Sequence, residues 1–320
     1  MENLLFSVNV VCPLFFLMAL GHVCRQIRFV SDSFLTEANR FVFKFALPLM
    51  LFENIRSAMG RDFSNPRLVV VAVLGILIII AVSTLIILPL VKRPGQRGAM
   101  IQGIYRSNFL IYGLPLATKM FGDEALEPLS LLLAVAVPLY NVAAVIILSV
   151  FSETQSSKPV NRVETFKQLG LNIICNPLII GCAVGTFFGL LHIQLPAIVG
   201  QPLRELATIA TPLGLFVMGG EFRFKNLQHN LLKVIGASLA RLILIPLTAM
   251  IVCIYIGFKG VDLGVLLCLF ATPSAVAGFI MAENMGCDSQ LAGQIVVLTT
   301  LCSCFTIFLF ILVMKNMGYF

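Results

Sequence analysis

The sequence predicts an all-α integral membrane protein whose ten transmembrane helices form two inverted repeats of five. Three observations point to this fold class. Hydrophobic residues make up 59% of the chain, charged residues 12%, and the mean hydropathy is +0.99. Several segments of more than twenty residues, such as 68–91, carry no charge, and a helix that spans a bilayer needs about 20 such residues. Motifs also recur at a constant distance, which indicates a duplication.

The apolar segments divide the chain into spans and short links. We expect spans at 5–24, 37–56, 68–91, 98–120, 127–150, 168–191, 198–220, 230–256, 262–282 and 289–313. The first span is interpreted as an uncleaved helix, because its leading residues carry Glu2 and no Lys or Arg. A polar link at 152–167 separates the first repeat (1–151) from the second (168–320).

The two repeats share motifs 164 positions apart. "ALPLMLF" begins at Ala46 and "ATPLGLF" at Ala210, and the same distance separates Gly21 from Gly185. Because five is an odd number of spans, the second repeat starts on the opposite side of the membrane and is inverted. Inverted repeats are typical of secondary transporters.

Basic residues set the expected orientation, because cytoplasmic loops collect Lys and Arg. The links after odd-numbered spans hold Arg25, Arg28, Lys92, Arg93, Arg97, Lys158, Arg162, Lys167, Arg223 and Lys225. The links after even-numbered spans hold Arg56, Arg61, Arg67, Arg204 and Lys259. We therefore predict a multi-pass protein of the cell membrane, with both termini outside and the 152–167 link in the cytoplasm. The net charge of +7 reflects this bias and predicts no nucleic-acid partner.

The fourth span contains Gly113 and Pro115. Proline removes a backbone donor and glycine permits unusual dihedrals, so this span should unwind near the middle of the membrane. The repeat places Pro273 and Gly278 of the ninth span at matching positions. Two matched breaks indicate a transporter's binding site, where half-helix N-termini favour an anion. The alternative is that glycine and proline only kink the two spans.

Four segments resemble the auxin efflux carrier family, its bacterial members and the plant PIN carriers alike. They are "ANRFVFKFALPL" (38–49), "NFLIYGLPL" (108–116), "TPLGLFVMGG" (211–220) and "TPSAVAGFIMAENMGCD" (272–288). The resemblance covers essentially all ten spans. It implies crossover helices at spans 4 and 9, similar to the sodium/bile-acid symporters. It also implies a scaffold of spans 1, 2, 6 and 7, a transport domain of spans 3–5 and 8–10, and a homodimer through the scaffold.

The resemblance extends to single residues. Asn108 matches the crossover asparagine that contacts the substrate carboxylate in plant carriers, and Pro115 and Pro273 match the two crossover prolines. Two features depart from the plant pattern: the cytoplasmic loop is short, and the span at 68–91 lacks an acidic residue. The bacterial branch is the closer fit, whose members resemble carriers of malate, malonate and similar small carboxylates, and auxin-like acids are less well matched.

Two arginines within spans are functional candidates, because ionisable groups at membrane depth are expensive. Arg241 lies about eleven residues into its span, or roughly 16 Å at 1.5 Å per residue. It can hold a substrate carboxylate in a bidentate pair, or it can bind carbonyls freed by the broken ninth helix. Arg106 lies shallower, and we favour capping or snorkelling over substrate contact for it.

Polar side chains near the breaks complete the expected site. Thr272 and Ser274 supply hydroxyls for substrate, an ion or a helix cap. Asn141 and Asn176 should form hydrogen bonds between helices, although Asn141 can instead face the pocket. The predicted substrate-site residues are Asn108, Gly113, Pro115, Thr272, Pro273, Ser274 and Arg241, with Arg106 and Asn141 as secondary candidates.

The sequence favours a secondary transporter that moves a small organic anion, a mono- or dicarboxylate, by alternating access. No C-x-x-C pair, metal motif, nucleophile elbow or phosphate loop occurs in it, so we expect no enzymatic activity and no cofactor. The coupling ion, proton or sodium, stays open. An anion channel and a transport-inactive sensor or assembly subunit are the alternatives.

Overall fold

The computed structural model describes residues 2–59, 65–153, 170–171, 173–222 and 227–320. This part of the chain consists of helices, short links and one isolated β-bridge. Four helical segments are long and apolar enough to cross a membrane: 66–90, 109–150, 230–256 and 289–316. The prediction of an all-α membrane protein is confirmed. The link predicted at 152–167 lies outside the described residues from 154 onward.

The helices of the two halves have the following bounds. The first half contains α1 (Glu2–Gln26), α2 (Asp32–Phe41), a π-helical turn (Val42–Ala46), α3 (Leu47–Met59), α4 (Pro66–Leu90), α5 (Pro94–Tyr105), a second π-helical turn (Phe109–Gly113), α6 (Leu114–Phe121) and α7 (Leu126–Val150). The second half contains α9 (Pro177–Leu190), α10 (Ala197–Thr208), α11 (Ala210–Glu221), α12 (Leu227–Leu239), a third π-helical turn (Ala240–Leu244), α13 (Ile245–Ile256), α14 (Gly260–Ala271), α15 (Ala277–Asn284) and α16 (Ser289–Asn316).

Asparagine followed by proline starts two of these helices. The side chain of Asn65 accepts a hydrogen bond from the Leu68 amide at 3.2 Å, and Asn176 accepts one from Leu178 at 3.0 Å. The prolines that follow lie in the first turn, where a backbone N–H would have no acceptor within the helix, so its absence costs no hydrogen bond. Asn176 is therefore a helix cap, and not the interhelical partner that we expected.

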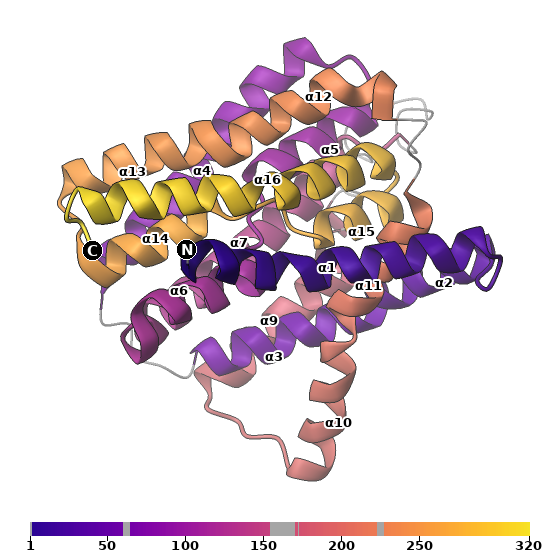
Figure 1. The fold of residues 1–320 in the computed structure, drawn as a ribbon. Helices are drawn as coiled ribbons and strands as arrows, with labels where there is room; N and C mark the ends of the chain where they lie inside the picture. Colours follow the sequence, from indigo (N-terminus) through magenta and orange to yellow (C-terminus); the bar gives the residue numbers. More distant parts are fainter. Residues whose placement is uncertain (1, 60–64, 154–169, 172, 223–226) are drawn as a thin grey trace.

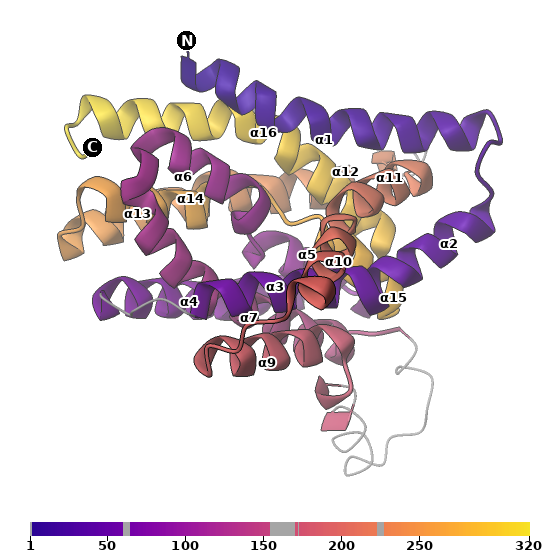
Figure 2. The ribbon, with the colours of Figure 1, turned by 90° about the horizontal axis from the view of Figure 1, so that it is seen from below.

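The helices form two layers in Figure 1. One layer holds α4, α5, α12, α13 and α16, and the other holds α1, α2, α3, α9, α10 and α11. In the second layer α1 packs extensively on α11 and α3 on α9. The two ends of the chain lie toward the same end of the molecule in Figures 1 and 2.

Both helix pairs of the second layer approach closely at a glycine. A Cβ atom on Gly21 of α1 would lie 1.9 Å from the carbonyl oxygen of Phe216 in α11. A Cβ atom on Gly185 of α9 would lie 2.8 Å from the carbonyl oxygen of Phe52 in α3. The two glycines are 164 positions apart, and so are the two phenylalanines. The two pairs thus pack through corresponding residues, as expected of a duplicated chain.

The break in the fourth predicted span falls earlier than we expected. α5 ends at Tyr105, residues 106–108 are not helical, and the chain becomes helical again at Phe109. Gly113 lies inside the π-helical turn and Pro115 in the first turn of α6, where proline is well tolerated. The fourth predicted span therefore does break, but it breaks at 106–108, before Gly113 and Pro115, which lie within the helical stretch that resumes at Phe109. The break in the ninth span does contain Pro273, between α14 and α15.

Candidate substrate-binding site

The two interrupted segments, 106–108 and 272–276, pair with each other, and we call this pairing the crossing. The Asn108 amide donates to the Pro273 carbonyl at 2.8 Å, and the Ala275 amide donates to the Arg106 carbonyl at 3.1 Å. Ser107 and Ser274 form an antiparallel β-bridge between them. Buried backbone that leaves a helix must find other partners. Here each break supplies the partners of the other.

Hydroxyl groups add to the crossing. The hydroxyls of Ser107 and Thr272 lie 2.5 Å apart. Thr299 of α16 accepts a hydrogen bond from the Ser274 amide at 3.2 Å. Thr272 therefore uses its hydroxyl within the protein. We did not predict Ser107 or Thr299, although hydroxyl side chains inside apolar helices are a usable sequence signal.

Arg241 forms hydrogen bonds to both broken helices next to the crossing. Its side chain is fully buried, with 0% exposure, and it projects from the π-helical turn between α12 and α13. The guanidinium donates to four backbone carbonyls: Thr272 at 2.8 Å, Tyr105 at 3.3 Å, and Ile104 and Leu269 at 3.4 Å. The last carbonyls of a helix have no partner within it. Arg241 supplies partners for the ends of α5 and α14, which is the second of the two roles considered for it.

Arg106 lies inside the protein and not near the surface. It is 5% exposed and donates to the side-chain oxygen of Asn141 at 2.7 Å and to the sulfur of Met281 at 2.8 Å. Asn141 in turn donates to the Val137 carbonyl of its own helix at 2.8 Å. The prediction of snorkelling is wrong because the helix breaks at Arg106 itself. A thioether is a weak acceptor, so a carboxylate would be a stronger partner for this guanidinium.

The side-chain amide of Asn108 has no hydrogen-bond acceptor. Its Nδ2 atom is buried and unbonded, and the residue is 4% exposed. A buried donor without an acceptor costs about 1–3 kcal/mol, and such groups call for an explanation such as a ligand. The Gly113 amide donates to the Asn108 carbonyl at 3.4 Å, and Pro115 lies further along, in α6. The structure thus gathers the other predicted site residues at the crossing but not Pro115.

The crossing is a region of buried positive charge. Within the described part of the chain, Arg106 and Arg241 are the buried charged residues, and the buried polar set contains no Asp or Glu. The ion pairs Arg25–Asp32 and Arg56–Glu53 lie elsewhere. Buried charge is unfavourable unless it is paired or hydrogen-bonded. Two buried cations without a buried carboxylate favour an anionic ligand.

A cavity of about 600 Å³ opens beside the crossing. Leu110 and Ile111 of the second π-helical turn form one wall, and residues of α3, α10 and α11 form the others. Arg56 and Arg204 bring positive charge into it and Glu53 negative charge. Asn108 itself is closed to solvent. The cavity reaches the turn that follows it, so a ligand must displace packed groups to reach the amide.

The described residues contain no cluster of three or more His, Cys, Asp or Glu side chains able to hold a metal ion. The hydroxyls of Ser107, Thr272 and Thr299 are all bonded to protein partners. The crossing is thus a site of amides, hydroxyls and guanidinium groups. Such groups recognise carboxylates through charge-assisted hydrogen bonds.

Comparison with known proteins identifies the family of this chain. The model of the membrane transport protein family matches residues 6–311. An uncharacterized transporter of Methanothermobacter thermautotrophicus is 22% identical over 302 residues, which cover 93% of this chain and 95% of the relative. An uncharacterized transporter of Methanocaldococcus jannaschii is 24% identical over 303 residues, 92% of this chain and 95% of the relative. Auxin efflux carrier component 8 of Arabidopsis thaliana is 30% identical over 125 residues, 37% of this chain and 34% of the relative. The chain belongs to the membrane transport protein family, the family of the auxin efflux carriers, and is a transporter and not an enzyme.

Proposed function

We propose that this protein is a secondary carrier that moves a small organic anion, a mono- or dicarboxylate, by alternating access at the crossing. One observation carries the proposal: among the described residues, two buried arginines without a buried carboxylate flank an asparagine whose buried amide has no acceptor. A substrate carboxylate supplies the missing acceptor and the missing negative charge. Small carboxylates such as malate and malonate fit this chemistry, and so does an auxin-like acid.

In this mechanism the substrate carboxylate accepts hydrogen bonds from Asn108 and Arg106. It replaces the sulfur of Met281 as a partner of Arg106, because a carboxylate is the stronger acceptor. Arg241 keeps its carbonyl partners and acts on the substrate through its charge alone. The broken helices α6 and α15 add the positive ends of their dipoles.

Alternating access requires the layers to move against each other. Two hydrogen bonds join the two groups of helices. Asn284 of α15 donates to Asn39 of α2 at 2.8 Å. Gln290 of α16 donates to the Glu221 carbonyl of α11 at 2.9 Å. The cavity beside Leu110 and Ile111 lies between the same two groups of helices. We assign the layer of α1, α2, α3, α9, α10 and α11 (spans 1, 2, 6 and 7) as the scaffold. The remaining helices (spans 3–5 and 8–10) are assigned as the transport domain.

The proposal includes ten spans in two inverted repeats, with both termini outside a cell membrane. It is supported by the glycine contacts of α1 and α9 and by the location of both chain ends at one end of the molecule (Figures 1 and 2). A homodimer through the scaffold belongs to the same proposal. Proton or sodium coupling is a question for the transport assay.

The test is transport by the full-length protein in liposomes, measured as uptake of labelled acid and as current on a solid-supported membrane. Malate, malonate, lactate and indole-acetate are compared with and without sodium and at two pH values. We expect saturable uptake of at least one acid, with counterflow. Uptake of none of them by folded protein would contradict the proposed substrate class, and flux without saturation or counterflow would indicate a channel.

Asn108→Ala is the decisive variant. We expect uptake to fall at least about tenfold, because a lost hydrogen bond to a charged group is worth about 1.5–3 kcal/mol. The melting temperature in detergent should not fall, because Nδ2 has no protein partner. Asn316→Ala, at an exposed asparagine at the end of α16, is the matched control. Uptake that survives in Asn108→Ala would remove this amide from the site.

A further inference from the structure

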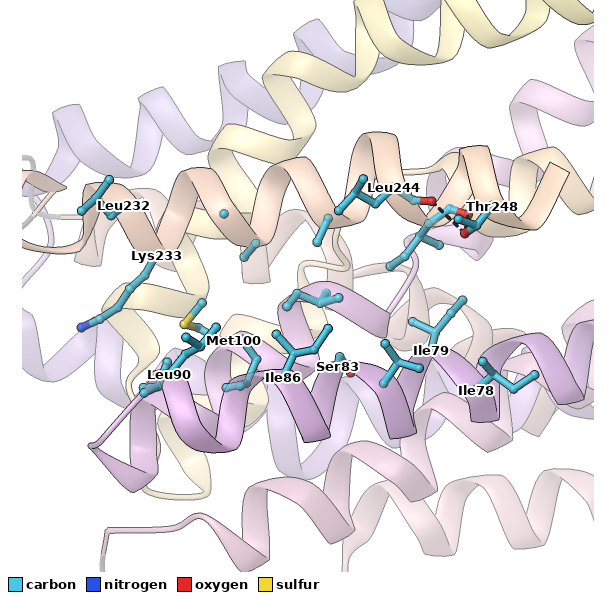
Figure 3. A pocket seen from close by; sticks show the side chains of 18 residues that line it. Ile78, Ile79, Ser83, Ile86, Leu90, Met100, Leu232, Lys233, Leu244 and Thr248 are labelled. Carbon is cyan, nitrogen blue, oxygen red and sulfur yellow. Dashed lines mark hydrogen bonds between the residues drawn. The ribbon is translucent and has the colours of Figure 1, made fainter. Parts of the chain in front are cut away.

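A groove of about 650 Å³ lies between α4 on one side and α12 to α13 on the other, with α5 at its base (Figure 3). Its walls are almost entirely apolar. Of the polar residues that line it, Ser83 donates to the Ile80 carbonyl at 3.0 Å and Thr248 to the Leu244 carbonyl at 2.8 Å. Both hydroxyls are thus bonded within their own helices. The walls therefore have few groups that can hydrogen-bond to a polar ligand, and their apolar side chains can pack against a hydrocarbon chain.

The groove is long and partly unfilled. Its lining residues on α4 run from Ile78 to Val91, a distance of about 20 Å at 1.5 Å per residue. That exceeds half the thickness of the hydrocarbon core of a bilayer, about 15 Å. At Gly236, a Cβ atom would meet nothing within 4 Å. A lipid acyl chain has the length and chemistry to occupy this space.

Positive charge collects at one end of the groove. Lys233 extends from α12 toward the Leu90 end of α4 (Figure 3), where it donates to the side-chain oxygen of Gln96 at 2.7 Å. Lys92 and Arg93 follow α4 directly and are exposed. The same Gln96 side chain donates to Asp288 at 3.0 Å, so one carboxylate lies beyond the amide.

The opposite end of the groove, at Ile78 and Thr248, is not lined by any charged residue of the described chain. Arg97 adds a further cation at the basic end, where it donates to the Val91 carbonyl at 2.6 Å. The groove therefore combines an apolar channel with a cationic end, which is the complement of a lipid with a negative headgroup.

We propose that the groove binds an anionic glycerophospholipid, with one acyl chain between α4 and α12–α13 and its phosphate beside Lys233 and Lys92. Basic pockets between transmembrane helices on the cytoplasmic side bind anionic headgroups in this way. The basic end is the cytoplasmic one in the orientation proposed above, so the lipid comes from the inner leaflet. Only this choice of leaflet rests on the proposed function.

The lipid would touch the part of the protein that supports the crossing. Ile104 and Ala240 line the groove. The Ile104 carbonyl accepts a hydrogen bond from Arg241 at 3.4 Å, and Ala240 directly precedes Arg241. A bound acyl chain therefore packs against the residues next to the Arg241 contacts and stabilises them.

The test uses the full-length protein in detergent, stripped of lipid, with native mass spectrometry and thermal unfolding as readouts. Palmitoyl-oleoyl phosphatidylglycerol is compared with phosphatidylcholine of the same chains and with glycerol phosphate. We expect phosphatidylglycerol to be retained about fivefold more than phosphatidylcholine, the contribution of about one basic contact, and to raise the melting temperature. Equal retention of the two lipids would overturn the proposal, and so would equal retention of glycerol phosphate.

Two variants separate the headgroup contact from the acyl chain contact. Lys233→Gln should abolish the preference for phosphatidylglycerol, and Lys233→Arg should restore it. Gly236→Leu fills the groove and should reduce retention of both lipids. Lys259→Gln, which removes an exposed charge beyond the other end of α13, should change neither. A preference that persists in Lys233→Gln, or retention that persists in Gly236→Leu, would overturn the assignment.

Discussion

At the scale of single residues, Arg241 resolves a difficulty that the broken helices create. Each break leaves carbonyl groups in the protein interior without a helical partner, and water is absent from the bilayer core. One guanidinium has five donors in a fixed plane, and here it serves carbonyls of α5 and α14 together. The charge that remains is not neutralised by a buried carboxylate within the described residues. Structural support and anion attraction thus come from the same side chain.

Arg241→Gln should destabilise the protein strongly. The amide of glutamine can replace at most two of the four carbonyl contacts, and each buried carbonyl left without a partner costs about 1–3 kcal/mol. We expect the free energy of unfolding to fall by about 3 kcal/mol or more, seen as a lower melting temperature in detergent. Arg204→Gln, at an exposed arginine, should melt as the wild type does. If Arg241→Gln is as stable as the wild type but loses affinity for substrate, the side chain contacts substrate.

Cys287, in the link between α15 and α16, should react slowly with thiol reagents. Burial, followed by the nearby carboxylates of Glu153 and Asp288, raises the pKa of this thiol to about 12. The neutral thiol is therefore favoured at pH 7, and the reactive thiolate becomes more abundant as the pH rises toward that value. With the other cysteines replaced, maleimide labelling of Cys287 should accelerate about tenfold per pH unit above pH 7.

Lys92→Cys, at an exposed position outside the expected spans, is the control for Cys287 in a background without the other cysteines. It should label rapidly at pH 7. Labelling of Cys287 as fast as Lys92→Cys at that pH would mean that the link opens in solution and that the thiol is not held in its buried environment.

At the scale of elements, the sequence predicts that the fourth and ninth spans break but misplaces one break. Gly113 and Pro115 are the visible local signals, yet a proline early in a helix begins it as readily as it interrupts one. The actual break at 106–108 depends on Pro273 and Ala275, which accept and donate its backbone hydrogen bonds. Those partners come from the other half of the chain. Local patterns cannot show them, whereas long apolar helices such as 66–90 and 289–316 are predicted by their apolar length alone.

The same limit applies to the side chains of the site. The position of Arg241 deep within an apolar span identifies it as important. Its partners belong to two separate helices, so the sequence does not show whether it binds substrate or backbone carbonyls. The burial of Arg106 is not predicted because its partners, Asn141 and Met281, also lie far away in the sequence. Asn108 is named through a family resemblance, and its unbonded amide is visible only in the packed structure.

The contact between α1 and α11 gives an element-scale prediction. Gly21→Ala places a Cβ atom 1.9 Å from the Phe216 carbonyl oxygen, so the helices must separate. We expect a loss of about 1–3 kcal/mol in the free energy of unfolding, as for other overpacked sites. Gly236→Ala is the control, because its Cβ atom meets open space and alanine favours a helix by about 0.5–1 kcal/mol. Equal melting temperatures would show that α1 and α11 lie further apart than described.

At the scale of the whole molecule, the two layers differ in how they are held together. In the layer proposed as the scaffold, the pairs α1–α11 and α3–α9 meet backbone to backbone at glycines, a contact that resists sliding. The helices proposed as the transport domain contact this layer through side-chain hydrogen bonds such as Asn284 to Asn39, and a cavity of about 600 Å³ lies beside the crossing. Individual hydrogen bonds contribute about 0.5–1.5 kcal/mol each, so they can be exchanged during transport. Rigid pairs within the scaffold and exchangeable bonds between layers are what the proposed movement needs.

The inverted repeat makes a prediction about the whole chain, because corresponding links of the two repeats must lie on opposite sides of the membrane. Lys92 follows the third span and Lys259 the eighth, and both are exposed. In a background without native cysteines, Lys259→Cys should react with an impermeant maleimide on intact cells. Lys92→Cys should react only after permeabilisation, since the basic link that holds it is predicted to face the cytoplasm. If both positions react from the same side, the two repeats are parallel and the transporter cannot be built as two inverted halves.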